Sequence, residues 1–161
     1  MIEATESRRV TDMSDPVLTT EHITQLVHRC IIELQNKNTR LLVDLSSLLH
    51  SLAQATGDDV YRVLASPLGG FAGELMSFRS LVAVPILPTE TREKCEGMLD
   101  NAIKGGLEAL EIVKNELQKG EARDYKEIVR AVALLTENDY ALYGERSALT
   151  RASSRSMPDT D

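Results

Sequence analysis

The chain's three histidines and its acidic residues are the side chains with which it could bind a metal ion. Carboxylate-bridged di-iron sites of helical bundles use Glu-x-x-His pairs, because residues three apart share one helix face. No Asp or Glu stands three residues before His22, His28 or His50, and the zinc motif His-Glu-x-x-His is also absent. The sequence therefore predicts no metal site, no cofactor and no metal-dependent catalysis.

One glycine-rich segment, Gly69-Gly70-Phe71-Ala72-Gly73, could suggest a phosphate-binding loop. Such a loop follows a strand and ends in Gly-Lys-Ser/Thr, and neither feature is present. We expect these glycines to interrupt a helix or to allow close packing. The few histidines and scattered serines form no specific nucleophile–base–acid set, so the sequence predicts that the protein is not an enzyme.

Cys30 and Cys95 lie far apart and match no zinc or redox spacing. We expect two buried, reduced thiols, because free cysteine behaves as a small hydrophobic residue. A redox pair is the alternative. Asp139 and Arg146 occupy two inward positions of a predicted helix, and we expect them to form a partly buried polar pair.

His50 falls opposite the apolar stripe of its predicted helix and should face solvent. The run His50-Ser51-Leu52-Ala53-Gln54-Ala55 resembles the phosphorelay segment of histidine-phosphotransfer domains, which are also four-helix bundles. Those domains carry Lys and then Gly at the third and fourth positions after the histidine. Ala53 and Gln54 stand at these positions here. The resemblance implies an alternative function, phosphotransfer with His50 as the phosphoacceptor.

The composition fits an aliphatic, helical core. Of 161 residues, 42% are hydrophobic but only 4% aromatic, and the net charge is −7. An acidic chain with dispersed Lys and Arg lacks the basic footprint of a nucleic-acid-binding protein. No apolar run is long enough to span a bilayer, and the N-terminus has no secretory apolar region, so we expect a cytoplasmic protein.

The first predicted helix carries a long apolar stripe. Its positions follow steps of three and four, as in a heptad: Val27, Ile31, Leu34, Asn38, Leu41, Leu45, Leu48 and Leu52. The polar run 35–40 could be a turn between two shorter helices. We favour one continuous helix from Thr19 or Thr20 to Thr56, because Leu34 and Leu41 are seven residues apart and the stripe resumes in phase.

The other elements follow from capping residues and periodicity. Asp58 can cap a short helix, Asp59–Ala65, which Pro67 closes, and an apolar segment follows over 71–84. A third helix is predicted over 89–119, with Gly106 permitting close backbone approach, and a fourth from Asp124 to about Leu149. The sequence thus predicts an all-α, four-helix-bundle-like domain over 19–150, with long first, third and fourth helices and a broken, apolar second segment. Residues 1–18 are a predicted flexible arm and 151–161 a disordered tail.

Two surfaces are candidates for association. Leu42 and Leu49 widen the first stripe beyond one partner helix, which suggests a homodimer. The candidate interface residues are Asn38, Leu41, Leu42, Leu45 and Leu49, with Asn38 either a solvated break or a buried amide paired across a two-fold axis. The second surface is the segment 68–87, with Phe71, Met76 and Phe78. That segment is alternatively a buried second helix.

The predicted function is therefore protein–protein association, as an adaptor, chaperone or regulatory subunit. The expected partners are proteins, a second copy of the chain included, and not nucleic acid or a spanned membrane. Besides phosphotransfer by His50, a bundle that binds a small apolar ligand between its helices is an alternative.

Overall fold

The computed structural model describes residues 16–156 and the side chains of residues 20–152. The described residues form five α-helices and one short 3-10 helix. These are α2 (Pro16–Gln35), α3 (Arg40–Thr56), α4 (Asp59–Val82), α5 (Thr89–Gln118), η1 (Gly120–Ala122) and α6 (Tyr125–Ser156). This part of the chain contains no β-strand, which confirms the all-α prediction.

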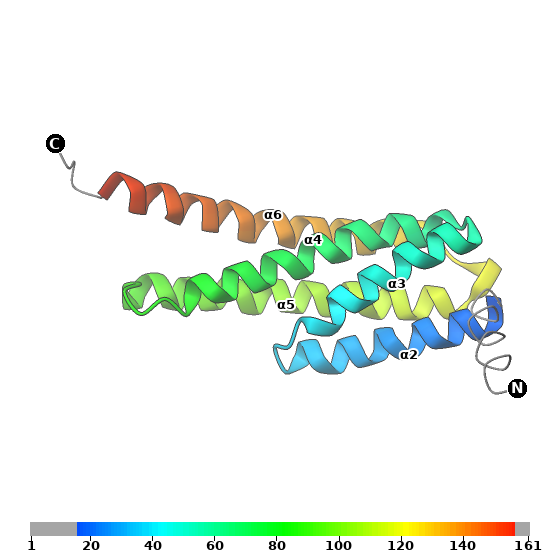
Figure 1. Cartoon of the computed structure of the whole chain (residues 1–161). Coiled ribbons are helices and arrows are strands. Elements are labelled where there is room, and N and C mark those ends of the chain that lie inside the picture. The colour runs from blue at the N-terminus through cyan, green and yellow to red at the C-terminus, as the bar shows by residue number, and fades with distance from the viewer. Residues whose placement is uncertain (1–15, 157–161) are drawn as a thin grey trace, which may run out of the picture.

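Three long helices and one short hairpin build the fold (Figure 1). Helices α4, α5 and α6 run the length of the molecule, each antiparallel to the one before it. Helices α2 and α3 form a hairpin of about half that length, in which α2 packs mainly on α5 and α3 on α4. One half of the molecule therefore contains five helices side by side, and the other half contains three.

The first predicted helix is divided in two, which corrects the continuous helix expected over 19–56. Helix α2 ends in a Schellman motif: Asn38 N–H donates to the Glu33 carbonyl at 2.8 Å and Lys37 N–H to the Leu34 carbonyl at 2.9 Å. Lys37 adopts the left-handed conformation, with φ 62°. The chain reverses there, so the polar run is the turn of the α2–α3 hairpin.

Helix α4 is continuous where the sequence predicted a break. Asp58 caps it as expected, because its Oδ1 accepts the Val60 N–H at 3.0 Å. Pro67 lies inside the helix instead of closing it. A proline removes the hydrogen bond to the carbonyl four residues earlier, which here belongs to Val63. Val63 is exposed, so water can bond that carbonyl and the helix tolerates the proline.

Helix α5 and the start of α6 lie close to their predicted bounds, and the two helices are antiparallel, as expected from their short connection (Figure 1). The N–H of Lys126 donates to Asp124 Oδ1 at 2.9 Å, so Asp124 caps α6. Helix α2 begins at Pro16 and α6 ends at Ser156, so helix extends into both the predicted arm and the predicted tail. The rest of both segments, residues 1–15 and 157–161, lies outside the described residues.

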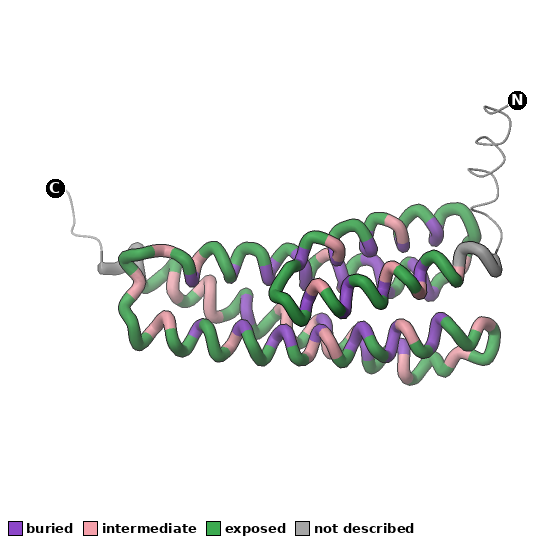
Figure 2. Tube along the Cα trace, turned by 90° about the horizontal axis from the view of Figure 1, so that it is seen from below, coloured by how far each residue is buried: buried purple, intermediate pink, exposed green. Residues whose placement is uncertain are grey.

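The core is densest where all five helices overlap (Figure 2). Phe71 is fully buried there and packs on Gly106, so this glycine makes room for side chains of α4 and α2, where the sequence predicted a close approach of backbones. A Cβ atom built on Gly106 would lie 2.5 Å from Phe71 Cζ and 3.3 Å from Leu34 Cδ2. Helices α2, α4 and α5 meet at this point because Gly106 has no side chain. Within residues 16–156, no helix has the length and apolar character needed to cross a membrane.

Candidate functional site

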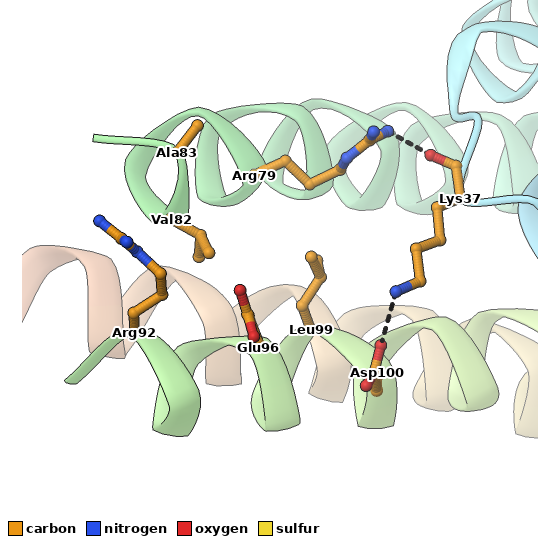
Figure 3. Close-up of a pocket in the computed structure, with 8 residues that line it drawn as sticks. All are labelled: Lys37, Arg79, Val82, Ala83, Arg92, Glu96, Leu99 and Asp100. Carbon is orange, nitrogen blue, oxygen red and sulfur yellow. Dashed lines mark hydrogen bonds and ion pairs between the residues drawn. The ribbon is translucent and has the colours of Figure 1, made fainter. Parts of the chain in front are cut away.

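An open cavity of about 520 Å³ lies where the α2–α3 hairpin ends, between the C-terminal part of α4 and the N-terminal part of α5 (Figure 3). Its apolar lining comes from Val82, Ala83 and Leu99. The other five lining residues are charged: Lys37, Arg79, Arg92, Glu96 and Asp100. A lining with this many charges suits a charged ligand better than the small apolar ligand considered from the sequence.

The hairpin turn forms one wall of the cavity. Arg79 Nη1 donates to the backbone carbonyl of Lys37, and Lys37 Nζ lies 3.5 Å from Asp100 Oδ1. Lys37 is thereby connected to both α4 and α5, as the dashed lines of Figure 3 show. Both side chains of the Lys37–Asp100 pair are more than half exposed, so the pair itself adds little stability.

The opposite end of the cavity is formed by Arg92. Its Nη2 donates to the carbonyls of Val84 at 2.6 Å and of Pro85 and Leu87 at 3.4 Å. These carbonyls belong to the turn that follows α4, so Arg92 ties this turn to α5. Its Nε is buried and has no hydrogen-bond partner among the described residues.

A second candidate surface lies on α6. Four large apolar side chains point outward on one face of this helix: Tyr125, Val129, Tyr140 and Tyr143, which are 64%, 64%, 70% and 52% exposed. We call these four residues the α6 outer row. Their separations of four, eleven and three residues keep them on one face along about 27 Å of helix.

The part of α6 around Tyr140 is low in charge, since between Ala131 and Gly144 the only charged residues are Glu137 and Asp139. The other end of the row is flanked by charged residues, Lys126, Glu127 and Arg130. The row also contains three of the chain's four tyrosines, while the fourth, Tyr61, and both phenylalanines are buried. A chain so poor in aromatic residues therefore places half of them on one exposed face. Tyrosine is enriched in protein interfaces.

A polar cluster between α4 and α6 replaces the predicted Asp139–Arg146 pair. Arg146 instead binds Glu74 through two hydrogen bonds, Nε to Oε2 at 2.8 Å and Nη2 to Oε1 at 2.9 Å. Asp139 and Arg146 are seven residues apart and hence about 10.5 Å along the helix. Glu74 lies opposite Arg146 on the neighbouring helix. The guanidinium group also stacks on Tyr143, 5.3 Å from the ring centroid.

Asp139 belongs to the same cluster but has no basic partner among the described residues. Burial and the negative charge of Glu74 raise the pKa of Asp139. The cluster is thus a bidentate ion pair with one extra carboxyl group. It contains no histidine or cysteine, and the described residues contain no group of side chains suited to a metal ion.

Most predicted interface residues lie inside the protomer. Leu42, Leu45, Leu49, Phe71 and Phe78 are fully buried in its own core. The five helices use these side chains to pack on one another, so none of them has surface left for a partner. The segment 68–87 is largely the second half of α4, with its apolar side turned inward.

Three predicted interface residues retain exposed surface. Met76 is exposed on α4, Leu41 is partly buried, and Asn38 is exposed in the hairpin turn. The amide of Asn38 is used within that turn, because Nδ2 donates to Glu33 Oε2 at 2.8 Å and Oδ1 accepts the Arg40 N–H at 3.1 Å. Asn38 is therefore exposed in this chain, and its side-chain amide is used within the turn.

The remaining predicted residues are placed individually. His50 is exposed on α3, as expected, with Ala53 buried one turn later. Cys30 and Cys95 are both free and buried. Burial raises the pKa of Cys30 to about 12, and burial also raises the pKa of Cys95. Burial thus disfavours the reactive thiolate form of both residues, and both are free and buried, as the sequence predicted.

Comparison with known proteins finds no relative of this chain. The chain matches no known protein family, no curated protein and no solved structure.

Proposed function

We propose that this chain is a non-enzymatic helical protein that acts by protein–protein association and forms a homodimer through the α6 outer row. The observation that carries the proposal is the exposure of Tyr125, Val129, Tyr140 and Tyr143 on one helix face. A fully covered tyrosine buries about 150–250 Å². The four side chains lie on one face as two pairs, Tyr125 with Val129 and Tyr140 with Tyr143, and exposed apolar surface that gathers on one face indicates a binding site.

A second copy of the chain is a suitable occupant of this patch. A two-fold axis crossing the α6 outer row would set the row of one copy against the same row of the other, in an isologous interface. The low charge of α6 between Ala131 and Gly144 limits repulsion around Tyr140, and Arg130 near Val129 is paired with Glu108 and Glu127 in each copy. Val132, which packs partly on the core beside Val129, would give the interface a rigid base.

An adaptor, chaperone or regulatory subunit is the kind of role that such a protein serves. Five of the interface residues predicted from the sequence are buried in the core, so a partner protein has to bind residues that remain exposed. The unpaired, buried state of Cys30 and Cys95 supports a reducing, cytoplasmic location.

Light scattering of two matched variants tests the proposal. Val129→Glu places a charge in the α6 outer row and should shift the protein to monomer at concentrations where the unmodified chain is dimeric. Val43→Glu places the same charge at an exposed valine on α3, outside the row, and should leave the dimer intact. Equal masses for the two variants would contradict the proposed interface.

A further inference from the structure

The cavity beside Lys37 continues a groove that the chain fills with its own helices elsewhere. In the five-helix half, the α2–α3 hairpin packs along α4 and α5. The hairpin turn stops at the cavity, and beyond it α4 and α5 have no further helix over this side (Figures 1 and 3). The shape of the site is therefore that of a position for another helical segment.

The floor of the cavity offers an apolar anchor point. Val82 and Leu99 are buried at its base, with 9% and 7% of their surface exposed, and Ala83 is exposed at its edge. In Figure 3, Val82 points down from α4 and Leu99 points up from α5 toward the same space. An aliphatic side chain placed between them would cover the small apolar surface left there, beside the Glu96 side chain that points into the same space (Figure 3).

The two arginines that line the cavity indicate which side chains a bound segment should carry beside its aliphatic residue. Arg79 and Arg92 have no carboxylate within ion-pair distance among the described residues, and both guanidinium groups bond only backbone carbonyls. They stand at opposite ends of the cavity (Figure 3). Most N–H groups of Arg79 thus remain available, and a carboxylate is the partner that a guanidinium group binds best.

Two carboxylates also face the cavity, both from α5. Asp100 is paired with Lys37, so its charge is compensated. Glu96 has no ion-pair partner among residues 20–152 and points into the space between Val82 and Leu99 (Figure 3). Glu96 therefore opposes an acidic ligand, and its removal should strengthen binding.

We propose that this cavity binds an acidic, amphipathic helical segment of a partner protein, with an aliphatic residue on Val82 and Leu99 and a carboxylate on Arg79. Arg92 offers a second guanidinium group for a carboxylate further along the segment. This inference rests on the proposed function as a protein-binding module, but it does not require self-association through α6.

Fluorescence anisotropy with a labelled synthetic peptide tests the site. The probe is a short helical peptide with leucines on one face and glutamates beside them, and its control carries glutamine in place of every glutamate. The glutamate peptide should bind more tightly, and its affinity should fall as NaCl is raised, because the pairing is electrostatic. Equal affinity of the two peptides, or absence of binding, would overturn the proposal.

Matched variants locate the binding. Arg79→Gln should weaken binding of the glutamate peptide about fivefold, the effect of losing one partly exposed charge pair. Arg62→Gln, at an exposed arginine elsewhere on α4, should leave it unchanged. Glu96→Gln should tighten binding several-fold, a gain that a merely structural role for the cavity does not produce.

A further variant is needed because Arg79 also bonds the hairpin turn, so Arg79→Gln removes a contact of the fold as well as a binding group. Ala83→Glu adds a negative charge at an exposed position of the cavity and should also weaken binding, with an unchanged circular dichroism spectrum. If neither Arg79→Gln nor Ala83→Glu differs from Arg62→Gln, the peptide binds elsewhere and the inference fails. Light scattering of the same samples reports self-association separately, so failure of this site and failure of the α6 interface remain distinguishable.

Discussion

Gly106 of α5 lies in van der Waals contact with the ring of Phe71 of α4, at a distance that leaves no room for a Cβ atom. Phe71 is among the largest fully buried side chains of the protein. The close approach of these two residues sets how near α4 and α5 come to each other, and the third helix at this point, α2, contributes Leu34.

Gly106→Ala should therefore destabilise the protein. The new methyl group would overlap the Phe71 ring, and overpacking of this kind typically lowers the free energy of unfolding by about 1–3 kcal/mol. Alanine favours helix over glycine by up to about 1 kcal/mol, which offsets part of that cost. Urea unfolding measures the difference.

Gly97→Ala is the matched control on the same helix. A Cβ on Gly97 would meet nothing within 4 Å, so only the helix propensity changes and the free energy of unfolding should rise by about 0.5–1 kcal/mol. If Gly106→Ala also stabilised the protein, Phe71 would not pack on Gly106 as described.

Local signals in the sequence were sufficient to predict several boundaries. Asp58 caps α4, Gly57 follows α3 with φ 72°, and Asp124 caps α6, as expected from residue type alone. The hairpin turn was missed because Lys37, not glycine, takes the left-handed conformation. Beyond the turn the core takes stripe residues Leu45 and Leu52 together with Leu42 and Leu49, while stripe residues Leu41 and Leu48 are only partly buried, so the resumed phase did not require one continuous helix.

The two candidate sites, the α6 outer row and the cavity, could not be predicted from the sequence because they depend on how distant helices pack. On α6, Ile128, Leu135 and Leu142 repeat every seven residues and face the core, while the α6 outer row follows helical spacing on another face of the same helix. Periodicity alone does not tell which of two apolar faces the other helices cover. The cavity likewise depends on where the α2–α3 hairpin stops, which no local pattern in α4 or α5 encodes.

The Glu74–Arg146 ion pair should contribute measurably to stability. Glu74 is almost fully buried, so Glu74→Gln would leave the Arg146 guanidinium without its counter-charge between α4 and α6. Because Arg146 is about one-third exposed, solvent moderates the loss, and we expect about 1–3 kcal/mol. Glu108→Gln is the matched control, since the Glu108–Arg130 pair is about half exposed and should cost less than about 0.5 kcal/mol. Similar losses in both variants would contradict this ranking.

Asp139 should make stability depend on pH in the opposite sense to a paired carboxylate. Burial, followed by the charge of Glu74, raises the pKa of Asp139 above 3.8. The folded protein thus holds this proton more tightly than the unfolded chain does, and stability is lost as the pH rises through that raised pKa. Asp139→Asn should raise the melting temperature at neutral pH, and the gain should shrink as the pH falls toward 3.8. A gain independent of pH, or one matched by Glu137→Gln, would contradict the assignment.

The two cysteines should be unreactive in the folded protein. Both are buried, and burial raises the pKa of Cys30 to about 12. A thiol-specific reagent at mildly alkaline pH should label neither residue without denaturant and both residues in concentrated urea. Rapid labelling of the native protein, or a disulfide formed under mild oxidation, would instead support a redox pair.

Self-association through the α6 outer row is the central claim, and sedimentation velocity of the unmodified chain over a wide range of concentration tests it most directly. We expect the mass to rise from 17.8 kDa toward twice that value as the concentration increases. A mass that stays at 17.8 kDa at the highest concentration would contradict the claim.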